Sequence, residues 1–342
     1  MPAKERALPF RPSFWLRGPN LQSIFPSLSL RKPFVRRRCA ALLNASCPVL
    51  LDCGEGVRLL GHCAATSAVS RAASGAQSRD PQQRLVIILH GWEGSSDSMY
   101  VIGLGQYLLE RGFDVFRLNL RDHGESHALN RDIFHSCRLA EVRGAVSRLA
   151  QLYPDHQRSM VGFSLGGNFA LRIGASLELK ANELMRIVAV SPVLDPQATL
   201  QALETGLPLY RRYFIDKWRR SLLKKQRAWP GQYDFAHLSQ LRDLTRMTED
   251  LVLQHTQYST LAQYLQGYAI TGEVLQSLQV ASRILIAKDD PIIPAQDLSR
   301  LHPHPRLQLT VTEHGGHCGF RDRLFGDGWL DRFIYEDLVR AD

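Results

Sequence analysis

Apolar and polar positions follow a regular pattern along most of this chain. From residue 85 onward, short apolar runs of strand length alternate with longer stretches that have the period of an amphipathic helix. The apolar runs span residues 85–90, 113–120, 159–163, 185–191, 283–287 and 307–311. The helical stretches lie near 98–110, 138–152, 165–177 and 295–301. Runs that are apolar on both sides are typical of a parallel sheet between two layers of helices, so the pattern predicts an α/β fold with a mostly parallel central sheet.

Two segments depart from this alternation of strand-like and helical stretches. Residues 49–64 alternate around a central Gly-Glu-Gly, which predicts a β-hairpin, and the small polar residues at 65–83 predict a flexible surface loop. Residues 196–280 carry no strand signal and consist of helix-forming sequence. An insertion of this size lies over the carboxyl ends of the strands, where open α/β folds bind ligands. We therefore expect a helical cap at 196–280.

These patterns predict a single catalytic domain made of three parts. We expect a basic N-terminal arm at 1–48 that packs on the body, an α/β core at 49–195 and 281–342, and the cap. With 342 residues, of which 44% are hydrophobic, the chain can bury a large core without disulfides. Its six cysteines show no paired spacing, which favours a reducing compartment.

The net charge of +9 is concentrated in two segments. Residues 1–38 contain nine Lys/Arg and one Glu, and residues 210–229 contain eight Lys/Arg and one Asp, so the rest of the chain is mildly acidic. No nucleic-acid-binding motif accompanies either segment, which argues against a nucleic-acid partner.

The second basic segment has the pattern of an amphipathic helix. The apolar residues that recur at helical spacing are Tyr210, Phe214, Trp218 and Leu222. The basic residues, most of them expected on other faces, are Arg211, Arg212, Arg219, Lys224 and Lys225. Two interpretations stay open. Either the apolar stripe packs on the body and the charges are solvated, or the helix rests on an anionic membrane and delivers lipid esters to the site below.

The chain shows no signal for crossing or entering a membrane. It has no stretch of 18 uninterrupted apolar residues, and residues 1–23 lack the apolar region of a secretion signal. That arginine-rich start also resembles a mitochondrial transit peptide, but its prolines work against the amphipathic helix of such peptides. We expect a cytoplasmic protein, with peripheral contact at the inner membrane surface as a further option.

A serine with glycine neighbours follows the third apolar run. The stretch Gly162-Phe163-Ser164-Leu165-Gly166 matches the GxSxG pattern of a nucleophile elbow, in which a strand turns directly into a helix and exposes the serine. A serine hydroxyl becomes a nucleophile only when a positioned base removes its proton and a third group orients that base. Ser164 is therefore a candidate nucleophile whose partners must lie elsewhere in the chain.

The two partners are expected in the order acid, then histidine. Asp290 follows the fifth apolar run and His317 follows the sixth, so both stand at the carboxyl ends of predicted strands, as Ser164 does. Side chains at these positions can meet at one rim of a parallel sheet. We predict that His317 is the base and Asp290 the acid that orients it. Asp289 and Asp195 remain alternative acids.

His317 also stands close to His314 and Cys318, a cluster that raises the question of a metal site. A structural zinc site needs four ligands and a catalytic one three plus water, and the chain has no CxxC or HExxH motif to complete the set. We expect neither a metal nor another cofactor. We interpret His314 as a structural histidine and Cys318 as a packing residue.

Acyl transfer through a serine places negative charge on an oxygen, which needs two backbone N–H donors. We predict that one donor is Leu165, directly after the serine, and the other is Trp92, in the loop after the first apolar run. His90 ends that run and is interpreted as an orienting residue.

Several stretches together resemble the α/β-hydrolase superfamily, and more closely its YheT-type branch, the AB hydrolase 4 family. They are "HGWEGSSDSMY", "RLNLRDHGESHALN", "GFSLGGN", "AKDDPIIP" and "GGHCGF", and "FWLRGPNLQSIFPS" at 14–27 is similar to the family's amino-terminal stretch. The resemblance implies an α/β-hydrolase fold and places the charge-relay residues at Ser164, Asp290 and His317. Asn20 departs from the family, in which His is frequent at that position. The membrane anchor common in animal relatives is missing here, which implies a bacterial enzyme.

Together these features predict a cofactor-free serine carboxyl-ester hydrolase that acts on a small-molecule acyl ester or lipid through an acyl-enzyme intermediate. Two alternatives stay open. One is an acyltransferase, in which an alcohol replaces water. The other is a non-catalytic binding protein on a hydrolase scaffold, which normally has a damaged triad.

Overall fold

One eight-stranded sheet forms the centre of the protein. A computed structural model describes residues 10–67, 83–180, 182–324 and 326–340. The strands, in chain order, are β1 Ser46–Asp52, β2 Arg58–Ala64, β3 Arg84–Leu89, β4 Phe113–Leu118, β5 Gln157–Phe163, β6 Arg186–Val190, β7 Ala281–Ala287 and β8 Leu307–Thr312. Their order across the sheet is β1-β2-β4-β3-β5-β6-β7-β8. Strands β3 to β8 are parallel and the hairpin β1–β2 is antiparallel, which confirms the predicted α/β class.

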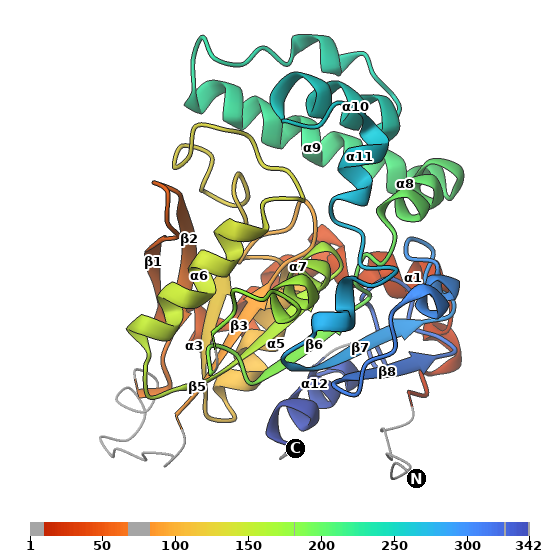
Figure 1. The fold of residues 1–342 in the computed structure, drawn as a ribbon. Helices are drawn as coiled ribbons and strands as arrows, with labels where there is room; N and C mark the ends of the chain where they lie inside the picture. Colours follow the sequence, from red (N-terminus) through yellow and green to blue (C-terminus); the bar gives the residue numbers. More distant parts are fainter. Residues whose placement is uncertain (1–9, 68–82, 181, 325, 341–342) are drawn as a thin grey trace.

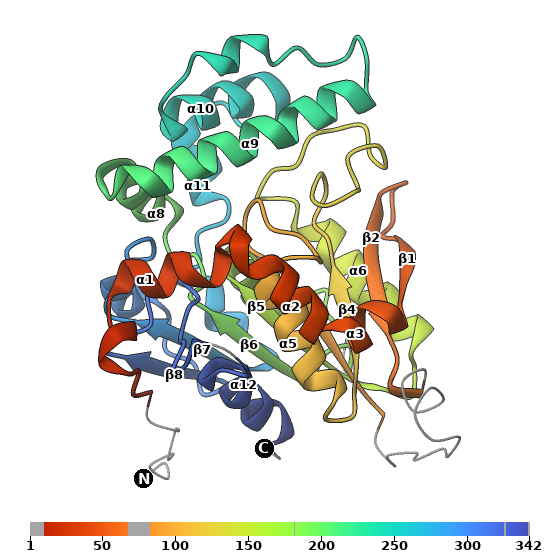
Figure 2. The same cartoon turned by 180° about the vertical axis from the view of Figure 1, so that it is seen from behind.

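Helices cover both faces of this sheet. In Figure 1, α6 (Leu139–Leu152) and α7 (Leu165–Gly174) lie in front of the strands. From behind, in Figure 2, α5 (Met99–Leu109) and α12 (Trp329–Val339) cover the opposite face. The stretch predicted to be helical at 295–301 forms a 3₁₀ helix, η6 (Ala295–Arg300). The sheet is therefore sandwiched, as its apolar runs predict.

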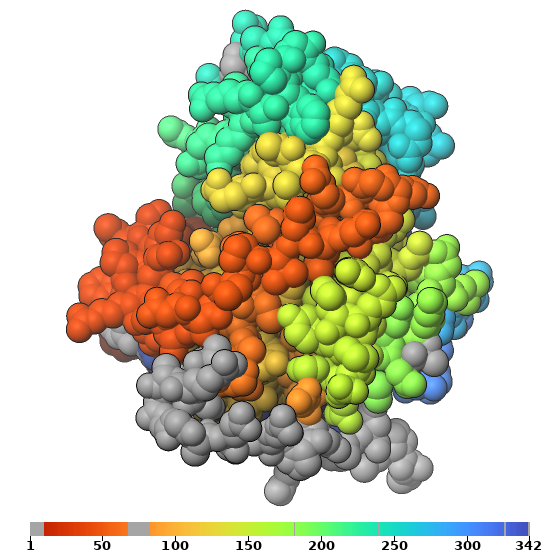
Figure 3. All heavy atoms as spheres, turned by 90° about the vertical axis from the view of Figure 1, so that its left-hand side faces the viewer, coloured from red at the N-terminus to blue at the C-terminus, as the bar shows by residue number. Residues whose placement is uncertain are grey.

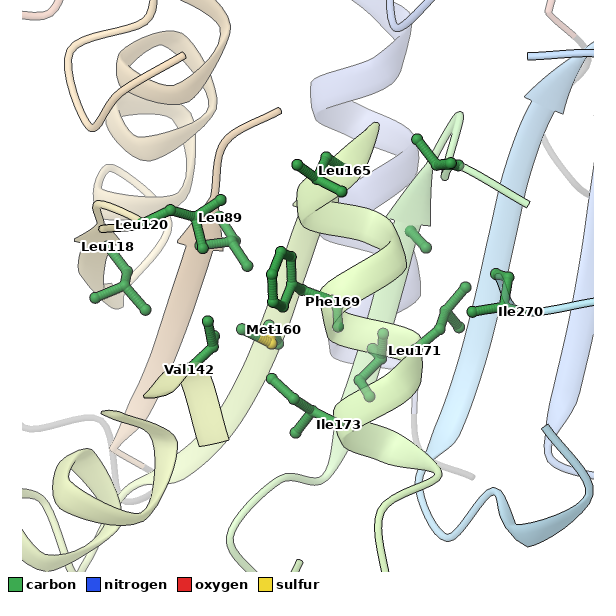
Figure 4. Packing of buried hydrophobic residues seen from close by; sticks show 14 of the residues in the cluster. Leu89, Leu118, Leu120, Val142, Met160, Leu165, Phe169, Leu171, Ile173 and Ile270 are labelled. Carbon is green, nitrogen blue, oxygen red and sulfur yellow. The ribbon is translucent and has the colours of Figure 1, made fainter. Parts of the chain in front are cut away.

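Successive residues of β3 enter two separate hydrophobic cores. Leu85 and Ile87 pack on the side of α6 and α7, and Val86 and Ile88 pack on the side of α5 and α12. Figure 4 shows the first of these cores, where Met160 of β5 and Phe169 of α7 meet. Because neighbouring side chains of a strand point to opposite faces, a strand buried on both faces must be apolar at every position.

One strand departs from that expectation. In β8 the side chains of Leu309 and Val311 are 47% and 43% exposed, so the prediction that this run is buried on both faces is wrong. The reason is its place at the edge of the sheet, where only β7 pairs with it. Most of the loop predicted at 65–83 lies outside the described residues.

The N-terminal arm crosses the face that α5 covers. Its helices are η1 Phe14–Leu16, α1 Pro19–Ile24, η2 Phe25–Ser27, η3 Ser29–Arg31, α2 Lys32–Arg38 and α3 Ala40–Ala45. Figure 2 shows the arm running beneath the cap, and in the space-filling view of Figure 3 its red surface protrudes from the body. The backbone N–H of Leu42 donates to Oε1 of Gln106 in α5 at 2.8 Å, which ties the end of the arm to the core.

The expected helical insertion lies above the carboxyl ends of the strands (Figure 1). Its helices are α8 Pro196–Thr205, α9 Pro208–Ala228, η4 Ala236–Ser239, α10 Leu244–His255 and α11 Leu261–Gln266, and η5 Val274–Ser277 leads back to β7. Within the described parts of the chain, no helix has the length and apolar character needed to span a bilayer.

Candidate active site

The turn between β5 and α7 holds Ser164 in a backbone conformation that side-chain-bearing residues rarely adopt, with φ 52° and ψ −117°. The neighbouring glycines make this turn possible. A Cβ atom on Gly162 would lie 2.3 Å from the carbonyl oxygen of Gly166, and one on Gly166 would lie 2.5 Å from the carbonyl oxygen of Leu89. The glycines of the GxSxG pattern are therefore required by direct backbone contact, and the serine is presented at the start of α7.

His317 lies between Ser164 and Asp290. Its Nε2 is 3.0 Å from Oγ of Ser164, and its Nδ1 is 3.0 Å from Oδ2 of Asp290. The three residues follow β5, β7 and β8, which are parallel strands, so their side chains meet at the same edge of the sheet. The structure thus brings together three groups that the sequence places 126 and 27 residues apart.

The surroundings of Asp290 fix the orientation of the imidazole. The carboxylate is fully buried, and its Oδ1 accepts the backbone N–H groups of Ile292 and Ile293 at 2.9 Å each. Because an ionised carboxylate can only accept, Nδ1 of His317 carries the proton in this bond. Nε2 is then free to accept the proton of the Ser164 hydroxyl.

The pKa of His317 is shifted upward by its neighbours. Burial acts to lower the pKa, but Cys318 and the Asp290 carboxylate act in the opposite direction and prevail, so the pKa of His317 lies well above its usual value. An imidazole with this property accepts a proton readily, as a general base must.

The two alternative acids serve other purposes. Oδ1 of Asp289 accepts the backbone N–H of Gly316 at 2.9 Å, and its carboxylate lies 3.4 Å from Nδ1 of His314. Asp195 caps α8 and forms an ion pair with Arg300 at 2.5 Å. Of the three acids weighed, Asp290 is the one whose carboxylate contacts His317.

The loop after β3 lies against Ser164. A Cβ atom on Gly91 would be 3.1 Å from Cβ of Ser164, so the loop approaches the serine as closely as its backbone allows. The backbone N–H groups of Trp92 and Leu165 donate to no other group in the parts of the chain that the structure describes. An oxyanion site requires two backbone N–H donors of this kind that are not already engaged.

His90 shapes this loop. Its Nδ1 donates to the carbonyl oxygen of Gly91 at 2.7 Å, and its Nε2 accepts the backbone N–H of Leu120 at 3.2 Å. Burial lowers the pKa of His90 to about 4, so the ring stays neutral at physiological pH. A neutral histidine with both nitrogens engaged orients a loop and has no free nitrogen with which to act as a base.

The cap packs on the same loop through its basic helix. The indole of Trp92 stacks on Phe214 of α9, with ring centroids 5.2 Å apart, and meets the edge of Trp218 at 5.0 Å. Tyr210 and Leu222 are buried as well. The apolar stripe of α9 is therefore directed at the body, as the first of the two interpretations expects.

One basic residue of α9 is buried, although the sequence analysis expects it in solvent. Lys225, expected with the solvated charges, is 1% exposed and donates to Asp122, in the loop after β4. The loop supplies oxygen acceptors beneath the helix, so this position faces inward although Lys224 beside it is exposed.

A link between the arm and the candidate active site is not predicted by the sequence analysis. In the structure, Oγ of Ser23 accepts the backbone N–H of His317 at 2.8 Å, and Oδ1 of Asn20 accepts the hydroxyl of Tyr210 at 2.9 Å. The only signal was the similarity of residues 14–27 to the family's amino-terminal stretch.

Among the described residues, no group of three or more His, Cys, Asp or Glu side chains is arranged to hold a metal ion.

Comparison with known proteins gives a consistent result. Residues 84–324 match a family model described as the alpha/beta hydrolase fold. YheT of Escherichia coli (strain K12) is 29% identical over 265 residues, which cover 74% of this chain and 76% of YheT. Phospholipase ABHD3 of Homo sapiens is 21% identical over 262 residues, which cover 75% of this chain but only 63% of that protein.

Solved structures are similar at the level of the fold. The esterase Pf2001 of Pyrococcus furiosus superposes with a TM-score of 0.55 at 16% sequence identity, over 88% of this chain and 95% of the esterase.

Proposed function

Because this chain belongs to the α/β-hydrolase fold family, we propose that it is a serine carboxyl-ester hydrolase with Ser164 as nucleophile, His317 as base and Asp290 as orienting acid. The observation that carries the proposal is the position of the His317 ring, whose two nitrogens lie 3.0 Å from Ser164 and 3.0 Å from Asp290. Triads of this kind convert an unreactive hydroxyl into a nucleophile.

The proposed reaction has two halves. Nε2 of His317 removes the proton of Ser164 as Oγ attacks the acyl carbon, and the N–H groups of Trp92 and Leu165 bind the resulting oxyanion. The imidazolium then protonates the leaving alkoxide. Water, deprotonated by the same nitrogen, attacks the acyl-enzyme, and the imidazolium returns the proton to Oγ of Ser164 as the acid leaves. Asp290 stabilises the imidazolium in both halves.

A fluorophosphonate probe tests this proposal directly, since such probes react with activated serines. The wild-type protein should be labelled, and Ser164→Ala should not be. A matched control is Ser27→Ala, which removes an exposed serine of the arm to which the proposal gives no covalent role. Equal labelling of wild type and Ser164→Ala would refute the assignment of the nucleophile.

The substrate class is proposed from the relatives. The names of two of them, an esterase and a phospholipase, refer to ester bonds. We propose a small-molecule acyl ester or a lipid ester as substrate. Transfer of the acyl group to an alcohol shares every step as far as the acyl-enzyme, so product analysis with added ethanol separates an acyltransferase from a hydrolase. An ethyl ester as the main product would favour transfer.

We further infer that contact with an anionic membrane, if it accompanies this activity, is made by the N-terminal arm and not by α9. The apolar stripe of α9 is already packed on the body. In the arm, by contrast, Phe14, Trp15, Leu30 and Phe34 are between 72% and 85% exposed. The described part of the arm, 10–48, also contains seven Lys/Arg and no acidic residue. Exposed aromatic side chains among basic ones match the apolar and anionic layers of a lipid surface.

A further inference from the structure

The loop that carries His317, residues 313–321, is held by the N-terminal arm. Oγ of Ser23, in α1, accepts the backbone N–H of His317 at 2.8 Å. The same hydroxyl donates to the carbonyl oxygen of Pro19 at 2.7 Å, one helical turn earlier. With both its donor and its acceptor engaged, the hydroxyl has a fixed direction. The bond joins residues 294 positions apart and acts on the backbone of the proposed base itself.

Gln22 anchors the far end of the same loop. Its side chain is 1% exposed, and its amide accepts the backbone N–H of Arg321 and donates to the carbonyl oxygen of Arg321, both at 2.8 Å. The second amide proton goes to the carbonyl oxygen of Leu16 at 2.6 Å. One buried side chain thus pairs with both backbone groups of a loop residue, as a neighbouring strand would.

Glycines allow the loop and α1 to touch through their backbones. A Cβ atom on Gly316 would lie 2.5 Å from the carbonyl oxygen of Pro19, and one on Gly319 would lie 2.2 Å from the carbonyl oxygen of Gln22. Neither position can carry a side chain unless the arm moves. The "GGHCGF" pattern therefore fits a loop that is built against a helix.

Three successive backbone N–H groups of the loop are held by side chains from three different segments. That of Gly316 donates to Asp289, that of His317 to Ser23, and that of Cys318 to Oγ of Ser191. Asp290 fixes the ring of His317, and these bonds fix its backbone. Of these three bonds, the one to Ser23 acts on the backbone of His317 itself.

The same short helix also contacts the cap. Oδ1 of Asn20 accepts the hydroxyl of Tyr210, at the start of α9. Helix α1 therefore lies between the cap and the loop that carries His317.

We propose that Ser23 is a positioning residue for His317 and that Gln22 supports it by fixing the loop to the arm. The inference rests on the proposed role of His317 as base. Since Ser23 bonds to the backbone of the base and not to substrate, its loss should lower kcat and leave KM nearly unchanged. Imprecise placement of a base affects the reaction step more than binding.

The test compares Ser23→Ala, Ser23→Thr and Ser27→Ala with wild type. The hydroxyl of Ser27, also in the arm, makes no hydrogen bond among the described residues, so its variant is a matched control. Labelling with a fluorophosphonate counts competent sites, and kcat on a p-nitrophenyl ester is expressed per labelled site. This removes any effect of misfolded protein. We expect Ser23→Ala to lower kcat by about tenfold, Ser23→Thr to recover most of it, and Ser27→Ala to match wild type.

The pH profile supplies a second readout. If Ser23 positions the imidazole against Asp290, its loss should also move the acid limb of kcat/KM toward lower pH. A role confined to folding would change neither kcat per site nor this limb, and that result would overturn the inference while leaving the triad intact. If Ser164→Ala retained labelling, the proposed function would fail first and the role of Ser23 with it.

Discussion

The ammonium group of Lys225 lies 2.9 Å from Oδ1 of Asp122, and both side chains are almost completely buried between the cap and the body. The same ammonium donates to the carbonyl oxygens of Asn130 and Asp132 at 2.6 and 3.0 Å, so all three of its protons are used. The second oxygen of Asp122 accepts the backbone N–H of Phe134 at 2.8 Å. Because the charged atoms of this buried pair all have hydrogen-bond partners, the pair fixes the position of α9 over the candidate active site.

Replacing this lysine should destabilise the protein strongly. Lys225→Met leaves a buried carboxylate and two carbonyl groups without their donor, and we expect the free energy of unfolding to fall by about 3–5 kcal/mol. Lys224→Met, at the exposed neighbouring position, should change it by less than about 0.5 kcal/mol. Chemical denaturation of both variants provides the measurement. Equal stabilities would mean that the buried pair contributes nothing.

The pH dependence of activity should report the raised pKa of His317. The base must be neutral to accept a proton, so kcat/KM should rise with pH through this pKa, with a midpoint above the usual histidine value of about 6.5. Asp290→Asn removes a charge that stabilises the imidazolium. We expect the midpoint to move to lower pH and kcat to fall by about 10⁴-fold. An unchanged midpoint in Asp290→Asn would show that this carboxylate does not act on the base.

His314 and His317, the two histidines of the 313–321 loop, should differ sharply in their importance for activity. His317→Ala should reduce kcat on a p-nitrophenyl ester by about 10⁶-fold, since the serine then has no base. His314→Ala removes a partly exposed ring that lies 3.4 Å from Asp289, whereas the nitrogen bonded to Ser164 belongs to His317. Its activity should stay within about twofold of wild type. Comparable losses in both variants would argue against His317 as the only base.

The candidate triad could be predicted because each member follows a local pattern. Ser164 stands in a glycine-flanked turn whose spacing is dictated by backbone contact, and Asp290 and His317 each follow an apolar run of strand length. Parallel strands place such positions at one edge, so no knowledge of long-range contacts was needed. The choice between Asp290 and Asp289, however, depends on which carboxylate faces the ring, and only coordinates reveal that.

Other features could not be predicted, because they depend on what lies opposite a residue. Lys224 and Lys225 are adjacent and chemically identical, and one helical step of about 100° decides which of them is buried. Likewise, Gln22 and Ser23 belong to a short helix whose partners lie some 300 residues away. Local sequence carries no information about such partners.

The turn between β5 and α7 should tolerate no side chain at its first glycine, Gly162. Gly162→Ala places a methyl group 2.3 Å from the carbonyl oxygen of Gly166, and we expect a loss of about 1–3 kcal/mol of stability together with loss of probe labelling. Gly103 in α5 is a matched control, because a Cβ atom there meets nothing within 4 Å. Gly103→Ala should raise stability by about 0.5–1 kcal/mol, since alanine favours the helix. Thermal unfolding measures both effects. A neutral Gly162→Ala would contradict the close backbone contact.

The exposed aromatic residues of the arm should govern binding to anionic vesicles. Cosedimentation with vesicles of phosphatidylcholine and phosphatidylserine should weaken by at least about tenfold in Trp15→Ala/Phe34→Ala, because two large apolar side chains no longer enter the lipid. Leu177→Ala is the control, since Leu177 is 83% exposed but lies outside the arm. Binding should also weaken with added salt and on vesicles without phosphatidylserine, because the basic residues of the arm act through screened charge. If the double variant bound vesicles as well as wild type, the arm would not be the membrane-binding surface. If it instead abolished self-association, the same side chains would serve contact between copies of the chain.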